Sequence, residues 1–99
     1  MTSATSSKNK EHAIITVIGK DRTGIVMAVT TALAKENVNI EDITQTIMGD
    51  YFVMAMLVDI KNAAKNIVDL RKKLDAVGEK TGQHIQIQHE KIFRAMHRI

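Results

Sequence analysis

The feature that most constrains the fold of this chain is a pair of segments with apolar side chains at both odd and even positions. Residues 12–18 read HAIITVI, and residues 51–59 read YFVMAMLVD. Because successive side chains of a strand point to opposite faces of a sheet, a strand that is apolar at both parities is covered on both sides. We therefore predict that these two segments are the central strands of a sheet.

Two further segments have the pattern of edge strands. In residues 39–48, NIEDITQTIM, isoleucines alternate with threonines, and in residues 84–88, HIQIQ, isoleucines alternate with glutamines. Gly49 and Asp50 separate the first of these from residues 51–59. A two-residue loop that begins with Gly favours a type II′ hairpin, which predicts that the strands on either side pair antiparallel.

Two amphipathic helices are predicted between the strands. Apolar residues with helical spacing in the first helix are Ile25, Val29, Ala32 and Leu33. Asn37 tolerates the left-handed backbone and is the expected stop of this helix. The second helix is predicted to begin after Asn62 as its N-cap and to end near Gly78 and Gly82. Its apolar stripe consists of Ala63, Ile67, Leu70, Leu74 and Val77.

The predicted order of elements is β-α-β-β-α-β, which indicates an α+β domain of the ferredoxin-like plait. Right-handed crossovers then give a four-stranded antiparallel sheet of order 4-1-3-2, with both helices on one face. The second face of the central strands needs a partner subunit or the C-terminal tail, where Ile92, Met96 and Ile99 recur with helical spacing. We expect a homodimer in which a short helical tail, residues 91–99, packs at the interface.

Length and composition restrict the classes of function. The 99 residues allow one domain, which we place at residues 11–90 after a flexible polar tail of residues 1–10. The chain has no cysteine, which excludes disulfides, thiolate metal sites and cysteine nucleophiles and favours a cytoplasmic location. No apolar run is long enough for a membrane span. A net charge of +3, with one tyrosine and two phenylalanines, speaks against a nucleic-acid partner.

Candidates for catalytic chemistry are few. All serines lie in the N-terminal tail, and Glu41 and Asp42 are neighbours on a strand, where they face opposite sides and share no acid–base site. The four histidines, at positions 12, 84, 89 and 97, lack the accompanying ligands of a metal site. We predict no catalytic residue, no metal and no cofactor.

The most informative loop is GKDRTG, residues 19–24, between the first strand and the first helix. It presents the N–H groups at the start of a helix, which attract anions. Asp21 could accept from an ammonium group while the amides hold a carboxylate, and Gly24 would let a ligand approach the backbone. Alternatively, Asp21 or Thr23 caps the helix while Arg22 is solvated. The local pattern alone favours this simpler role.

One helix N-terminus is insufficient for ligand binding of micromolar affinity. Such affinity needs about 8 kcal/mol, whereas a charge at a helix N-terminus contributes roughly 0.3–1 kcal/mol. The remaining contacts would come from elsewhere, and the edge strand of a neighbouring subunit carries Asn39 and Asp42. Ligand binding and dimerisation would then be linked.

Taken together, residues 13–59 strongly resemble an ACT domain, the small regulatory fold attached to many enzymes of amino-acid metabolism. The specific features are the D-R-T-G-I-V loop and helix start, the N-V-N-I entry to the second strand, and the Gly49-Asp50 hairpin. The resemblance covers residues 12–90, and the whole chain looks like the stand-alone ACT-domain proteins of prokaryotes.

The resemblance implies a non-enzymatic module that senses an amino acid or another small metabolite, in a homodimer whose interface completes the pocket. The family's ligand-contacting loop falls on Lys20, Asp21, Arg22, Thr23 and Gly24. Its contact at the entry to the second strand falls on Asn39. What such a module would regulate, a partner enzyme or a regulator, is open.

Two other functions stay open at this point. An acylphosphatase-like hydrolase could use the same plait, with Arg22 holding phosphate and Asn39 orienting water, although Asp21 would repel the phosphate. A pure protein-interaction module could use the exposed sheet face or the tail to dock on a partner.

Overall fold

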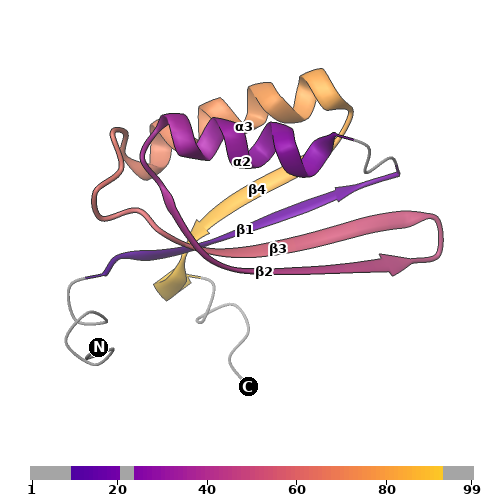
Figure 1. Ribbon diagram of the computed structural model, residues 1–99, viewed down its shortest axis with the longest axis horizontal. Coiled ribbons are helices and arrows are strands. Elements are labelled where there is room, and N and C mark those ends of the chain that lie inside the picture. The colour runs from indigo at the N-terminus through magenta and orange to yellow at the C-terminus, as the bar shows by residue number, and fades with distance from the viewer. Residues whose placement is uncertain (1–9, 21–23, 93–99) are drawn as a thin grey trace.

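The computed structural model describes residues 10–20 and 24–92 (Figure 1). The elements in chain order are β1 (His12–Gly19), α2 (Ile25–Lys35), β2 (Asn39–Met48), β3 (Tyr51–Asp59), α3 (Ile67–Thr81) and β4 (His84–His89). The strands form one antiparallel sheet of order β2-β3-β1-β4. This confirms the ferredoxin-like plait that the sequence predicts, with the strand order read from the opposite edge.

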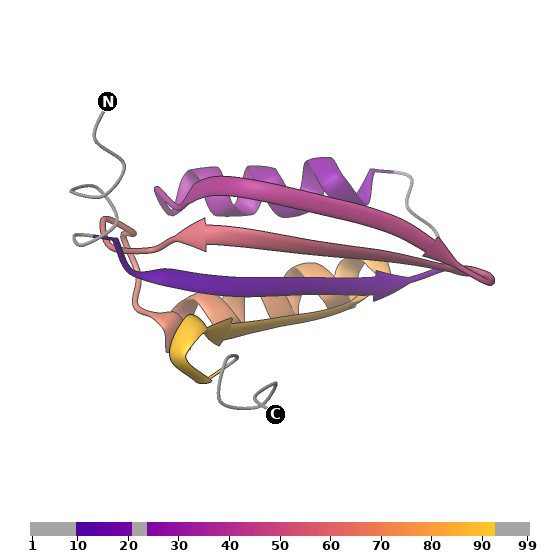
Figure 2. The same cartoon turned by 90° about the horizontal axis from the view of Figure 1, so that it is seen from below.

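The core lies between the two central strands, β1 and β3, and the helices. Both helices lie on one side of the sheet, α2 next to the β2 edge and α3 next to β4 (Figure 2). On this side Ile15 of β1 pairs with Met56 of β3, and Val17 pairs with Met54. All four side chains are at most 1% exposed. The helices therefore complete one face of the sheet.

Neither α2 nor α3 lies over the opposite face of the sheet (Figure 2). Ile14 pairs with Leu57 and Ile18 pairs with Val53, and cross-strand partners share a face. These four apolar side chains lie on the face away from the helices, and Ile18 is 40% exposed. The prediction that the helices cover only one face is thus confirmed.

The terminal segments are only partly described. Of the predicted helical tail, residues 91 and 92 continue a helical turn that begins at residue 90, and residues 93–99 lie outside the described residues. The same holds for residues 1–9 of the predicted N-terminal tail. In the part of the chain that the structure describes, no helix is long and apolar enough to cross a membrane.

The turns follow the local signals in the sequence. Asn37 has a φ of 59°, the left-handed conformation expected at the stop of the first helix, and α2 ends at Lys35. Its side-chain Nδ2 also donates to the carbonyl oxygen of Asn62, at 2.9 Å. Gly49 has a φ of 60° whereas Asp50 has no positive φ, as a type II′ hairpin requires.

The start of α3 differs from the sequence prediction. The N-cap is Asn66, whose Oδ1 accepts from the backbone N–H of Asp69 at 2.9 Å, so the expected cap at Asn62 is wrong. The preceding residues are held by bonds to distant backbone: the N–H of Ile60 donates to Glu11 and that of Ala64 to Glu36. These bonds stretch residues 60–65 across the ends of β1 and α2, and the helix begins about one turn later.

Glu36 is the one buried charged residue in the described part of the chain, with 8% of its surface exposed. It follows α2, and its carboxylate accepts from Lys73 Nζ at 2.8 Å and lies 3.7 Å from Lys65 Nζ. The hydrogen bond from Lys73 and the charge of Lys65 lower the pKa of Glu36 below 4.5, against the opposing effect of burial. The ion pair ties the end of α2 to α3.

Replacing Gly78 with Ala tests how closely α3 approaches β4. Ala normally stabilises a helix by about 1 kcal/mol relative to Gly. Here a Cβ would lie 2.7 Å from the carbonyl oxygen of Gln83, in the backbone that leads into β4. We expect Gly78→Ala to lower the free energy of unfolding in urea by about 1–3 kcal/mol, since the backbone must shift. A more stable variant would contradict this packing.

The Glu36 ion pair predicts a dependence of stability on pH. Because the folded-state pKa of Glu36 is lowered, its stabilising effect is present above pH 4.5 and is lost as the pH falls below that value. We expect Glu36→Gln to be less stable than the wild type at pH 7, with the difference shrinking toward pH 3. Urea unfolding across this range measures it. Glu79→Gln, at an exposed site on α3, is the control and should show no such convergence.

Candidate ligand-binding site

The connection between β1 and α2 is where the sequence places the ligand site. Lys20 follows β1 and is exposed, and Gly24 is the N-cap of α2. Gly24 has a φ of 74°, which L side chains rarely adopt, with open space around its Cα. Because Gly24 has no side chain to cap α2, the N–H groups of the first turn lack an acceptor within the helix. Asp21, Arg22 and Thr23 lie outside the described residues.

A hollow lies beside Lys20 at the carboxyl end of β1. Its lining comes from the ends of three strands and of α3: Ile18, Gly19, Lys20, Tyr51, Thr81, Gly82, Gln83 and His84. Lys20 Nζ lies 5.9 Å from the centre of the Tyr51 ring, within the range of a cation–π interaction. The hollow thus offers a cation and an aromatic face to a small carboxylate ligand, while the first amides of α2 belong to the neighbouring loop and not to its lining.

Tyr51 is a candidate site residue that sequence reasoning missed. It begins β3, and the register of β1 against β3 places Gly19 opposite Phe52, so Tyr51 lies next to Lys20. The hairpin signal gave the pairing of β2 with β3. The hairpin signal does not determine the register between β1 and β3, and only that register places Tyr51 beside Lys20.

Asn39, the sixth predicted contact residue, lies at the other end of the sheet. It begins β2 and pairs with Asp59, which in turn pairs with His12 at the start of β1. The eight residues of β1 separate it from Lys20, a distance of about 25 Å at roughly 3.3 Å per residue. Within one chain, therefore, the structure does not bring Asn39 to the loop. It could join the loop of a second chain.

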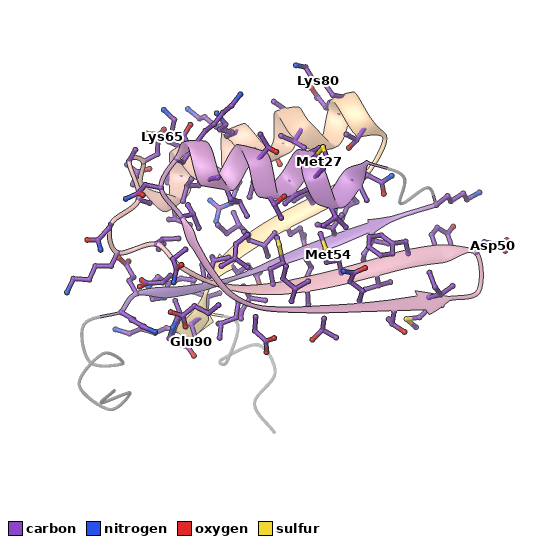
Figure 3. All side chains as sticks on the ribbon, in the orientation of Figure 1. Met27, Asp50, Met54, Lys65, Lys80 and Glu90 are labelled. Carbon is purple, nitrogen blue, oxygen red and sulfur yellow. The ribbon has the colours of Figure 1, made fainter. Side chains whose placement is uncertain are left out.

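A cluster of charged side chains lies at this second end. His12 Nε2 lies 2.9 Å from Glu41 Oε1, and His12 Nδ1 lies 3.6 Å from Glu90 Oε1. Lys10 Nζ lies 2.6 Å from Glu41 Oε2. The hydrogen bond from Lys10, with that from His12, lowers the pKa of Glu41 below 4.5. Figure 3 shows Glu90 on the face of the sheet away from the helices.

The cluster was not anticipated from the sequence, which treats Glu41 as a charged edge-strand residue. The strand has a register shift between Ile40 and Asp42, so Glu41 is an extra residue opposite β3. Its side chain is only 16% exposed. Among residues 10–20 and 24–92, no group of three or more histidines and carboxylates has the arrangement of a metal site.

Comparison with known proteins identifies the family. A family model described as an ACT domain matches residues 11–88. A UPF0237 protein of Methanocaldococcus jannaschii is 51% identical over 89% of this chain and 98% of its own length. The solved structure of an ACT domain protein from Streptococcus pneumoniae is 39% identical, with a TM-score of 0.77, over 86% of this chain and 96% of that one.

A further structural neighbour carries a regulatory function in its name. The regulatory subunit of aspartate kinase from Thermus thermophilus is 28% identical, with a TM-score of 0.61, over 79% of this chain and 50% of that one. ACT domains are small-molecule-binding regulatory modules. Because the family model spans most of the described fold, from β1 to β4, this chain belongs to the ACT domain family.

Proposed function

We propose that this protein is a non-enzymatic regulatory module that binds an amino acid at the β1–α2 loop and works as a homodimer. The observation that carries the proposal is the left-handed Gly24 at the start of α2, next to the exposed Lys20. A helix start of this kind offers several N–H groups to one carboxylate. The ligand-contacting residues proposed are Lys20, Asp21, Arg22, Thr23 and Gly24 of one chain and Asn39 of the other.

The class of ligand is supported by both chemistry and relationship. A positive helix end and Lys20 suit a carboxylate, and Asp21 supplies the anion that an α-ammonium group needs. The family membership supports a small molecule as ligand, and one neighbour is named as the regulatory subunit of an aspartate kinase. Together these favour a zwitterionic amino acid over a phosphate ester, which Asp21 would repel.

The homodimer is supported by the exposed edge of the sheet. β2 is an edge strand whose side chains from Asp42 to Met48 are all exposed, with Ile47 at 59% and Met48 at 63%. An open edge with exposed apolar residues is a template for pairing with another strand. Two β2 strands paired antiparallel would put Asn39 of one chain near Met48 of the other, at the end of the sheet that holds the loop.

Thermal denaturation with a panel of amino acids tests ligand binding. A true ligand at about 100 times its Kd adds about 2.7 kcal/mol, so we expect one amino acid to raise the melting temperature by roughly 10–20 °C. Gly24→Ala should abolish this rise because the strained loop no longer presents its amides. Gly49→Ala has a similar φ and equally open space, so both variants should lose about 1–2 kcal/mol of stability, but Gly49→Ala should keep the rise.

The proposal fails if none of the amino acids shifts the melting temperature, or if Gly24→Ala responds as fully as Gly49→Ala. The first result would exclude these amino acids as ligands, and the second would place ligand recognition away from the start of α2.

Light scattering at micromolar concentration tests the dimer. We expect twice the chain mass of 11.0 kDa for the wild type. Ile47→Lys should give the monomer, because it puts a charge on each of two paired edges. Val68→Lys is the matched control on α3, where Val68 is 52% exposed, and it should stay dimeric. A monomeric wild type, or two dimeric variants, would contradict pairing through β2.

A further inference from the structure

A groove with a volume of about 600 Å³ lies between α2 and α3, on the helical side of the molecule. It is lined by the N-cap Gly24, by Met27, Ala28, Thr31, Ala32 and Lys35 of α2, and by Lys73, Ala76, Val77 and Lys80 of α3. Figure 3 shows Lys80 on the side of α3 away from the sheet. The groove is therefore separate from the core and from the uncovered sheet face.

Small side chains at helical spacing create the groove. Gly24, Ala28 and Ala32 recur every four residues along α2, and Ala76 lies on the facing side of α3. The core contacts of the same helices come from larger residues, which lie beneath the groove: Ile25, Val29, Leu33, Leu70 and Leu74. The fold does not need the groove to be filled, and Met27 at its rim is left 73% exposed.

The charged residues that line the groove are all lysines. Lys73 bonds to Glu36, which places the first half of α3 beside the end of α2, where Lys35 lies. Lys80 comes two turns later, toward Gly24, so the groove has cations near both ends. In the described part of the chain, neither Lys35 nor Lys80 forms an ion pair.

Shape and charge together define what can fill this groove. Its length from Gly24 to Lys35 is about 16 Å at roughly 1.5 Å per residue, or three turns of a helix. A second copy of the groove would bring lysines against lysines, which is unfavourable. A flat lipid surface would leave the hollow empty. An amphipathic helix fits, with apolar residues along one stripe and carboxylates beside it.

We propose that the α2–α3 groove docks an amphipathic helix of a partner protein, about three turns long. Its apolar stripe fills the hollow between Ala28 and Val77, and its acidic flanks face Lys35 and Lys80. The groove gives the chain a docking surface of its own, beyond the proposed ligand site. Because Gly24 lines one end of the groove, the partner helix would contact the same first turn of α2 as a bound ligand.

Nuclear magnetic resonance titration of the ¹⁵N-labelled full chain, without any amino-acid ligand, tests the proposal. The probes are three synthetic helical peptides of about fourteen residues with one leucine-rich stripe, flanked by Glu, by Gln or by Lys. We expect the Glu-flanked peptide to shift the amide signals of Ala28, Thr31, Ala76 and Lys80 and to bind roughly tenfold more tightly than the Lys-flanked one. High salt should weaken its binding.

Charge reversal makes the test independent of folding defects. The double variant Lys35→Glu/Lys80→Glu should prefer the Lys-flanked peptide, a gain that an unfolded protein cannot produce. Lys61→Glu/Lys72→Glu carries the same change of charge at exposed sites outside the groove and should keep the wild-type preference.

The proposal is overturned if the Glu-flanked peptide does not bind at millimolar concentration, or if its shifts fall on the uncovered sheet face. It is also overturned if both double variants keep the wild-type preference. Binding to phosphatidylserine vesicles that Lys35→Glu/Lys80→Glu removes, without peptide binding, would assign these lysines to a membrane instead. Loss of the amino-acid response in Gly24→Ala has no bearing on these outcomes.

Discussion

The structure depends on the pairing of β1 with β3, two strands that are apolar on both faces. Toward the helices, Ile15 opposite Met56 and Val17 opposite Met54 are sealed from water, and burial of each such side chain contributes about 1.5–3 kcal/mol. Both crossovers pass over this face, so the helices form a single layer. The other face lies away from α2 and α3 and the β2 edge is unpaired within the described sheet, and the proposed dimer uses that edge.

The same pairing determines which parts of the chain meet. Its register collects the β1–α2 loop, the β2–β3 hairpin and the start of β4 at one end of the sheet, and leaves Asn39 at the other. Of the contact residues that the sequence nominates, Lys20 and Gly24 therefore lie at one end and Asn39 at the other. A ligand that needs both ends needs two chains, which links the proposed recognition of an amino acid to the proposed dimer. The α2–α3 groove lies on a third surface and touches the loop only at Gly24.

The sequence predicts features that depend on a local pattern, but it does not predict features that depend on contacts between distant segments. Asn37 is foreseen as a helix stop because its left-handed backbone is a property of one residue. The sequence does not foresee that Asn66 rather than Asn62 caps α3, because both residues are good caps. Hydrogen bonds to distant backbone decide between them. The contact of Glu41 with His12 is not foreseen either, because His12 belongs to β1, a strand that is not the neighbour of β2 in the sheet.

The central claim is that a carboxylate ligand binds at the start of α2, in a site that a second chain completes. A crystal structure grown with the most stabilising amino acid tests it most directly. The account predicts electron density for the ligand between two chains, its carboxylate on the first amides of α2 and Asn39 of the other chain within hydrogen-bond distance. It would be contradicted by a ligand bound elsewhere, or by first-turn amides that are capped by the side chain of Asp21 or Thr23.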